Sequence, residues 1–233
     1  MRSAFYEESL YPLQDGVLSV VSRCNVPFYL TGGTALSRGY YHHRYSDDLD
    51  FFVNDDPDFR AQVEAVLAKL KETGYAWSES KTEFIRAETF WSLKVMKGDS
   101  GVKLKLDFVN DIPAHFGGFT ETPVFTKTDS IRNMLSNKLS ALFRFAAKDV
   151  ADIREIALHE QFNWPEIARE ASQKDAGVDL PMFGEMLETM RPIDYETIQW
   201  TRDVPWERFY GDIRIIARDM VFCADNSLAT GER

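Results

Sequence analysis

The sequence predicts an α+β protein, in which an N-terminal part mixes strands with helices and a C-terminal part is almost entirely helical. Short runs of alternating apolar and polar residues, which are typical of strands, occur before residue 110. From Asp129 onward apolar residues recur at helical spacing instead. We therefore predict an α/β domain over residues 1–128 and a helical domain over 129–233, since a chain of 233 residues can form two cores.

The first domain begins with alternating helices and strands. The apolar spacing of residues 9–24 indicates an amphipathic helix, and a second helix is predicted to begin near Pro57 and to end at Gly74. Between them the sequence predicts, in chain order, a strand at 28–31 that runs into Gly32-Gly33, a helix at 34–43 and a strand at 48–53.

Four stretches rich in aromatic and β-branched residues follow, separated by short turns. They are YAWSES (75–80), TEFIRAE (82–88), FWSLKVMK (90–97) and VKLKLDFV (102–109). This succession predicts an antiparallel meander. The irregular segment 111–128 is predicted to be a hinge.

The second domain is predicted to be built from helices, the first of which has Asp129 or Ser130 as its N-cap. The predicted helices cover 130–146, 149–160, 164–175, 180–190 and 205–223. In the first of them Lys138, Leu142 and Phe145 have the spacing i, i+4, i+7, which places the lysine beside the apolar seam.

The net charge of −10 argues against indiscriminate nucleic-acid binding, because an acidic protein repels phosphate at long range. Residues 94–148 nevertheless hold 9 basic and 5 acidic side chains. These cations either form a phosphate-facing surface or are scattered solvated charges, and composition does not separate the two. The chain has neither a signal-peptide pattern nor an apolar run of about 18 residues, so we expect a cytoplasmic protein without a membrane span.

Carboxylates on two predicted strands indicate a site for divalent metal ions. Asp48 and Asp50 point to one side of their strand, and Asp107 lies on the polar face of the strand 102–109. Like charges this close need a cation, and oxygen ligands of this kind suit Mg²⁺. If the two strands pair with matching faces, three acids surround one site that could hold two ions. The alternative is an exposed strand face with solvated acids.

The two glycines that end the strand 28–31 favour a phosphate site. A strand that passes through Gly32 and Gly33 into a helix presents free backbone N–H groups and a positive dipole end, and Thr34 adds a hydroxyl. The spacing is not that of a Walker A loop. His42 and His43 are adjacent on the predicted helix, so they point about 100° apart and do not easily bind one transition metal.

These motifs resemble those of the nucleotidyltransferase superfamily that shares the polymerase β catalytic core. More narrowly, GGTALSRGYYHHRYSDDLDFF (32–52) looks like the first motif of the AbiEii/AbiGii-type nucleotidyltransferase toxins, including Arg44 and Ser46. KLSALFRFAAKDVADI (138–153) is similar to the helical motif of that family. The resemblance covers residues 28–158 and implies a mixed sheet with flanking helices, followed by a helical domain that completes the active-site cleft.

The resemblance also implies roles for single residues. Gly32, Gly33, Thr34 and Ser46 would bind the nucleotide, and Asp48 and Asp50 would bind the metals. Asp107 would be the third carboxylate. In the helical motif Lys138 would contact triphosphate oxygens, Arg144 would also bind the nucleotide, and Asp152 would be the acid of the site. Arg144, Lys148 and Asp149 would be its supports.

We therefore expect an enzyme that transfers a nucleoside monophosphate from a nucleoside triphosphate to an acceptor hydroxyl, with two Mg²⁺ ions, or Mn²⁺ in their place. The family implies a toxin of a toxin–antitoxin or phage abortive-infection system, an RNA acceptor such as a tRNA 3′ end, and a separately encoded antitoxin. Two alternatives stay open at this point. One is a nucleotide-binding or partner-binding module without turnover, and the other is a metal-dependent phosphohydrolase that uses water as the acceptor.

Overall fold

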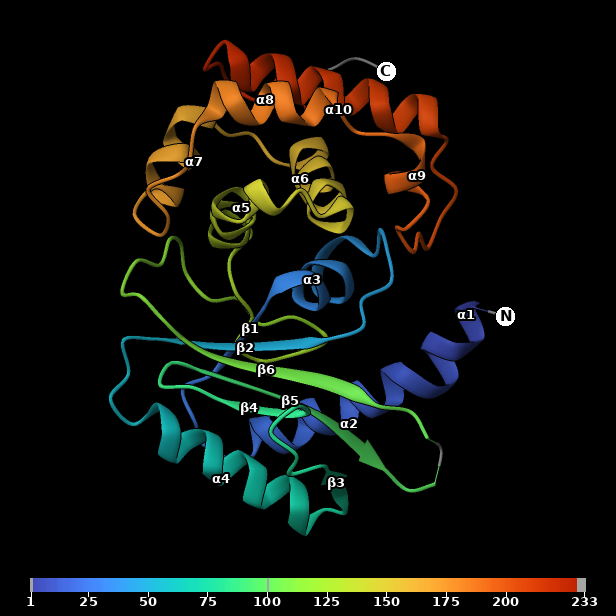
Figure 1. The fold of residues 1–233 in the computed structure, drawn as a ribbon, viewed down its shortest axis with the longest axis vertical. Coiled ribbons are helices and arrows are strands. Elements are labelled where there is room, and N and C mark those ends of the chain that lie inside the picture. The colour runs from blue at the N-terminus through green and yellow to red at the C-terminus, as the bar shows by residue number, and fades with distance from the viewer. Residues whose placement is uncertain (1, 100, 230–233) are drawn as a thin grey trace. The chain divides into compact units, whose positions relative to one another are not determined.

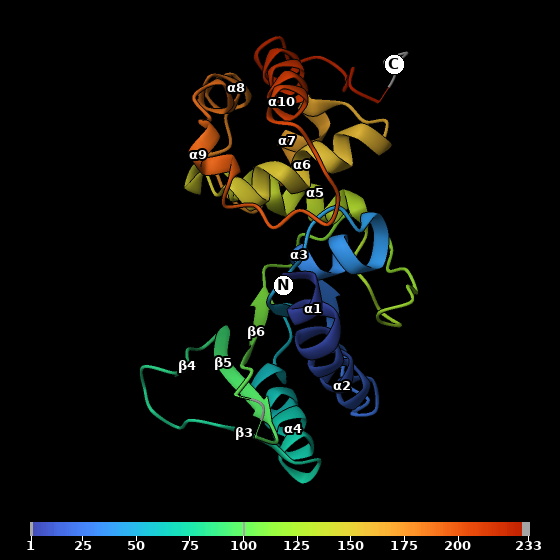
Figure 2. The ribbon, with the colours of Figure 1, turned by 90° about the vertical axis from the view of Figure 1, so that its right-hand side faces the viewer.

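The structure, a computed structural model, describes residues 2–99 and 101–229 (Figures 1 and 2). The chain divides into two compact units, Met1–Pro113 with Gly118–Asp129, and Ala114–Gly117 with Ser130–Arg233. The short piece 114–117 joins the second unit because Ser130 Oγ donates to Phe116 O at 2.5 Å and Phe116 N donates to Asn133 Oδ1 at 3.2 Å. That the second unit is a separate domain stays a prediction.

A mixed sheet forms the centre of the first unit, with the strand order β1-β2-β6-β5-β3 and β4 paired to β5. β2 and β6 are parallel, and the remaining pairs are antiparallel. The strands are β1 (Tyr29–Thr31), β2 (Leu49–Asn54), β3 (Tyr75–Trp77), β4 (Phe84–Arg86), β5 (Phe90–Lys97) and β6 (Leu104–Asp111).

The predicted meander holds for β4, β5 and β6 but not for β3. β3 pairs with the end of β5, Tyr75 opposite Lys97, whereas β4 pairs with its beginning, Phe84 opposite Leu93. Two short strands thus share one edge of a strand of eight residues. The physical reason is length, because neither short strand has enough residues to cover the edge of β5 alone.

The core of the first unit lies on one face of the sheet. Leu49, Phe51 and Val53 alternate with half-buried residues along β2, and Phe51 stacks on Phe108 of β6 at a centroid distance of 5.4 Å. α4 (Phe59–Glu72) lies along this side of the sheet, beside α2 (Tyr11–Ser22) (Figure 1). α4 buries Val63, Val66 and Leu70 at helical spacing. The polar residues of β2 and β6 therefore lie on the opposite face.

Two helical stretches of the first unit contain a π-helical segment, which the spacing of apolar residues does not predict. α2 is preceded by α1 (Arg2–Phe5) and η1 (Tyr6–Leu10), so helical backbone begins before the predicted residue 9. After β1, α3 (Gly32–Thr34) continues directly into η2 (Ala35–Tyr41). η2 ends where His42 adopts a left-handed conformation with φ 52°.

The second unit is helical over its described residues. Its elements are α5 (Ile131–Ser140), η3 (Leu142–Arg144), α6 (Ala147–His159), α7 (Trp164–Ala171), α8 (Leu180–Glu188), α9 (Pro192–Tyr195) and α10 (Trp206–Val221). Ser130 is the N-cap of α5, since its side chain accepts a hydrogen bond from Asn133 N. α8 and α10 pack closely, and Gly184 permits the contact, because a Cβ there would lie 2.6 Å from Ala217 O.

The predicted single helix over 130–146 is wrong. α5 ends at Ser140, a short 3₁₀ turn follows, and Phe145 is left-handed with φ 48°. The chain reverses here because Lys138 on α5 and Asp149 on α6 form an ion pair of 2.5 Å, which a continuous helix would not allow. Lys138, Leu142 and Phe145 therefore do not lie on one helix. No helix among the described residues is long and apolar enough to cross a membrane.

Candidate active site

The predicted carboxylates lie in one row across the sheet of the first unit. Asp50 of β2 is the direct partner of Asp107 on β6, and Asp107 is the partner of Ser92 on β5. Cross-strand partners point to the same face, and this face is opposite the apolar core. The pairing of β2 with β6, on which the third carboxylate depended, is thereby established. Asp48 directly precedes β2.

Lys105 places an ammonium group among these acids. Its Nζ lies 2.5 Å from Asp107 Oδ2, while Ser92 Oγ donates to Asp107 Oδ1 at 2.6 Å. Partial burial lowers the pKa of Lys105, but the contact with Asp107 and the charges of Asp48 and Asp50 outweigh it, so this pKa lies above its ordinary value. All three predicted carboxylates thus act on one cation.

Gly32 brings the backbone of the glycine pair against this row. It has φ +70°, and a Cβ on residue 32 would lie 2.2 Å from Asp50 Oδ2. Any side chain here would displace the carboxylate, and the left-handed backbone also favours glycine. The first glycine is therefore required both by conformation and by the closeness of Asp50.

Gly33 packs against Arg44 and Ser46, which belong to the same motif (32–52). A Cβ on residue 33 would lie 2.4 Å from Arg44 Nη2 and 3.0 Å from Ser46 Oγ. Arg44 is buried and donates from Nη1 to Tyr45 O at 2.9 Å, which fixes the loop before β2. The glycines, Arg44, Ser46 and Asp50 therefore meet at one place in the first unit.

Thr34 also contacts the loop before β2, and its hydroxyl is already hydrogen-bonded. Its side chain is buried, and Oγ1 donates to the backbone carbonyl of Asp48 at 2.5 Å. The hydroxyl hydrogen is therefore committed to positioning Asp48. Asp47 is turned elsewhere, since Asp47 Oδ1 accepts from Tyr6 Oη at 2.7 Å.

The donor set of this row has the chemistry of a magnesium site, because carboxylate oxygens are the ligands that Mg²⁺ prefers. Within residues 2–99 and 101–229, however, no group of three or more His, Cys, Asp or Glu side chains has an arrangement that could hold a metal ion. The orientation of Asp107 accounts for this, as its two oxygens face Ser92 and Lys105. A metal that binds all three acids must therefore compete with the Lys105 ammonium.

A second cluster of predicted residues lies in the second unit. Lys138 Nζ is 2.5 Å from Asp149 Oδ1 and 2.7 Å from Asp152 Oδ2, and the Asp152 side chain is completely buried. Arg144 Nη2 lies 3.7 Å from Asp149 Oδ2 but is mostly exposed. Two acids three residues apart on α6 thus hold one lysine from α5. That this cluster completes one active site with the carboxylates of the first unit stays a prediction.

Comparison with known proteins decides the family. The sequence matches the nucleotidyl transferase AbiEii toxin family, of the type IV toxin–antitoxin systems, over residues 20–215. The chain belongs to the AbiEii nucleotidyltransferase toxin family. It is thus a nucleotidyltransferase, and the family implies an antitoxin as its partner. No functionally curated protein sequence matches it.

Two solved structures from Helicobacter pylori are similar to this AbiEii-family chain. JHP933 aligns with a TM-score of 0.63 and 18% identity, covering 92% of this chain and 93% of JHP933. A protein described provisionally as a nucleotidyltransferase aligns with a TM-score of 0.62 and 18% identity, covering 97% and 99% of the two chains. At this identity the similarity concerns the fold, and it agrees with the predicted mixed sheet and helices.

Sequence reasoning did not assign roles to two residues that contact Asp107 in this AbiEii-family protein. Strand alternation places Ser92 on the same face of β5 as Lys94, two residues later. It likewise places Lys105 on the same face of β6 as Asp107. The register that makes Ser92 a partner of Asp107 is the missing information. His42 is exposed and His43 is buried, so the adjacent histidines lie in different environments.

Proposed function

We propose that this protein transfers a nucleoside monophosphate from a nucleoside triphosphate to a hydroxyl of an RNA acceptor, with release of pyrophosphate, and that the reaction depends on Mg²⁺. The observation that carries the proposal is the row Asp50–Asp107–Ser92, with Gly32 against Asp50 and with Asp48 and Asp50 both acting on Lys105.

In the proposed mechanism Asp48, Asp50 and Asp107 would hold the ions. Divalent ions supply charge neutralisation of the phosphates and activation of the attacking hydroxyl. The residues of the chain do the rest. Thr34 fixes Asp48 through its backbone carbonyl, and Ser92 fixes the orientation of Asp107. The backbone N–H groups at Gly32 and Gly33 are proposed to bind phosphate oxygens.

Lys138 is proposed to bind the triphosphate from the second unit. Asp149 and Asp152 hold its ammonium in place, which reduces the entropy lost when a phosphate binds. The same two carboxylates offset the positive charge of the ammonium. We therefore propose that Lys138 binds the triphosphate through a directed hydrogen bond more than through long-range attraction.

An RNA acceptor is favoured by lysines on the carboxylate face of the sheet. Lys94 and Lys105 are cross-strand partners two positions along the register from Ser92 and Asp107, so they point to the same face, and Lys103 lies two residues before Lys105. Lys94 and Lys103 are exposed. Lysines beside a catalytic site can bind the phosphates of an acceptor strand.

The proposal is tested with labelled nucleoside triphosphates, Mg²⁺ and total tRNA. Asp48→Asn should abolish transfer of label to RNA, whereas Asp47→Asn, a neighbouring change at a residue that contacts Tyr6, should retain it. Equal labelling by both variants would reject the site. Release of phosphate without any acceptor would indicate the phosphohydrolase instead, and nucleotide binding that is indifferent to Mg²⁺ would indicate the module without turnover.

A further inference from the structure

A pocket of about 470 Å³ in the second unit has a wall rich in arginine. It lies between the end of α6, the segment that follows α9 and the first turn of α10. Its charged and titratable lining residues are Arg154, His159, Arg202, Asp203 and Arg208. The volume is within the range of pockets that hold small molecules, which is about 300–1,000 Å³.

The composition of this pocket differs from that of the surrounding chain. Residues 149–233 hold 9 basic and 18 acidic side chains, yet the charged wall of the pocket has three arginines and one aspartate. Such a concentration of guanidinium groups within an acidic half of the sequence requires an explanation. Arginines gather where planar, two-oxygen groups such as phosphate are bound.

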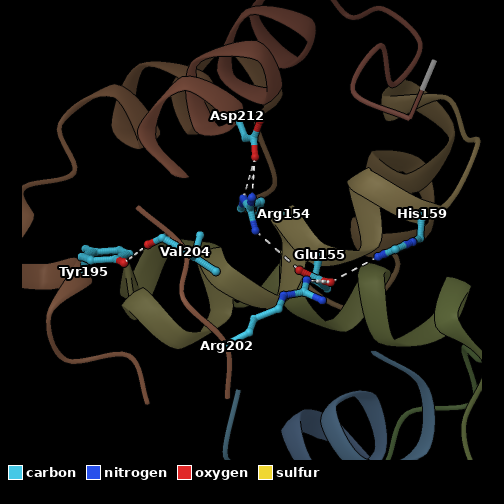
Figure 3. Close-up of polar contacts among 7 residues, drawn as sticks. All are labelled: Arg154, Glu155, His159, Tyr195, Arg202, Val204 and Asp212. Atoms are coloured by element: carbon cyan, nitrogen blue, oxygen red, sulfur yellow. Dashed lines mark hydrogen bonds and ion pairs between the residues drawn. The ribbon is translucent and has the colours of Figure 1, made fainter. Parts of the chain in front are cut away.

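Two of the arginines are held in place by carboxylates that do not line the pocket (Figure 3). Arg154 donates to Asp212 Oδ2 from Nε at 2.9 Å and from Nη2 at 2.5 Å. Arg202 donates from Nη2 to Glu155 Oε1, which is also 3.2 Å from His159 Nε2. The guanidinium groups are therefore fixed before any ligand arrives, which is the arrangement expected of a preorganised binding site.

Arg154 has a donor that these partners leave unused. Its side chain is 2% exposed, and Nη1 is buried without a hydrogen-bond acceptor among the described residues. Nη1 lies 3.5 Å from Glu155 Oε2, which also has no hydrogen bond there. Because Nη1 is buried and faces Glu155, Arg154 contributes its charge and its fixed position to the pocket wall, and not a hydrogen bond to a ligand.

Arg208 supplies a guanidinium group that is not held in an ion pair by any described residue. It is exposed on the first turn of α10, and it has no ion pair or hydrogen bond with any described residue. Glu155 and Asp212 neutralise Arg202 and Arg154, and Asp203 offsets Arg208 in the charge of the wall, so attraction of an anion depends on guanidinium donors that are not in ion pairs rather than on net charge.

We propose that this pocket is a binding site for a small phosphate-bearing molecule, separate from the triphosphate contact of Lys138. Arg208, and the donors of Arg202 that Glu155 does not use, donate to the phosphoryl oxygens, and Arg154 forms the buried wall behind them. Asp152, which pairs with Lys138, and Arg154 are two residues apart on α6, so they point to nearly opposite sides of that helix.

Calorimetry on the full chain, in buffer with EDTA and without phosphate, tests the site. Inorganic phosphate, pyrophosphate and a nucleoside 5′-monophosphate are titrated separately, which identifies the source of the phosphoryl group. We expect at least one of them to bind, and Arg208→Ala to weaken it at least about tenfold. Arg214→Ala removes an exposed arginine of α10 outside the pocket and should bind as the wild type does.

Lys138→Ala separates this site from the proposed nucleotide site. Binding that survives Lys138→Ala and is lost in Arg208→Ala supports the arginine pocket, even if the protein transfers no nucleotide. Absence of binding by all three compounds at millimolar concentration would overturn the proposal. So would binding that is lost in Lys138→Ala and unchanged in Arg208→Ala.

Discussion

Gly32 and Asp50 occupy neighbouring positions so close that residue 32 has no room for a side chain. The Cβ of an alanine at 32 would lie 2.2 Å from Asp50 Oδ2 and 3.0 Å from its Cγ. The glycine motif and the metal-binding acid are therefore one structural feature of the first unit, although 18 positions separate them in the sequence.

Gly32→Ala should disable the enzyme and destabilise the protein. The left-handed backbone alone costs an alanine about 1–2 kcal/mol, and the carboxylate of Asp50 must also move. Gly118→Ala is the matched control, because a Cβ there meets nothing within 4 Å and its φ is not in the left-handed region. Urea unfolding and nucleotide transfer measure both effects. Equal stability and activity of the two variants would show that Gly32 and Asp50 are not packed together.

Lys105→Met should increase the affinity for Mg²⁺, by about tenfold. The ammonium lies 2.5 Å from Asp107 and interacts with Asp48 and Asp50, so it competes with a metal for the same oxygens. Thermal unfolding with and without Mg²⁺ reports the difference by mass action. Lys103→Met is the control, because Lys103 is exposed and lies 3.6 Å from Glu83. The competition is disproved if both variants respond to Mg²⁺ alike.

Lys138→Met should lower the free energy of unfolding by about 3 kcal/mol, since it leaves Asp149 and Asp152 buried without their shared cation. Adding Asp152→Asn should restore part of the loss, because Asp149 then no longer has a second buried carboxylate beside it. Lys148→Ala, an exposed change nearby, should have an effect within about 0.5 kcal/mol. Additive losses in the double variant would contradict this coupling.

Arg202→Ala should loosen the segment between α9 and α10. Arg202 and His159 share the completely buried carboxylate of Glu155, so removal of the guanidinium leaves that charge less compensated. We expect a loss of about 1–3 kcal/mol, and faster proteolysis after residue 196. Arg191→Ala breaks the exposed pair with Asp194, which solvent screens, and should cost clearly less than Arg202→Ala. Similar losses in both variants would show that Glu155 does not anchor the segment.

The carboxylate row could be predicted from the sequence in large part. Strand alternation placed Asp48, Asp50 and Asp107 on polar faces, and the family resemblance implied that Asp107 is the third carboxylate, while the pairing of the two strands was only a condition. What alternation does not contain is register. The partnership of Asp107 with Ser92 depends on which residues of β5 and β6 pair, and the sequence has no local signal for that.

The helical half was harder to predict because its turning point is set by contacts distant in the sequence. Apolar spacing continues through residues 130–146, so one helix was the natural prediction. The break after Ser140 reflects the ion pairs between Lys138 and the acids of α6, which require the chain to reverse. The clusters around Glu155 and Arg154 could not be predicted for the same reason, because their partners Arg202 and Asp212 come much later in the sequence.

We propose above all that the site around Asp48 transfers nucleotides to RNA. Mass spectrometry of intact tRNA, after incubation with all four nucleoside triphosphates and Mg²⁺, tests it most directly. We expect wild type and Asp47→Asn to add one or more whole nucleoside monophosphates to the RNA mass, and Asp48→Asn to add none. An unchanged RNA mass with the wild type, accompanied by hydrolysis of the triphosphates, would contradict it.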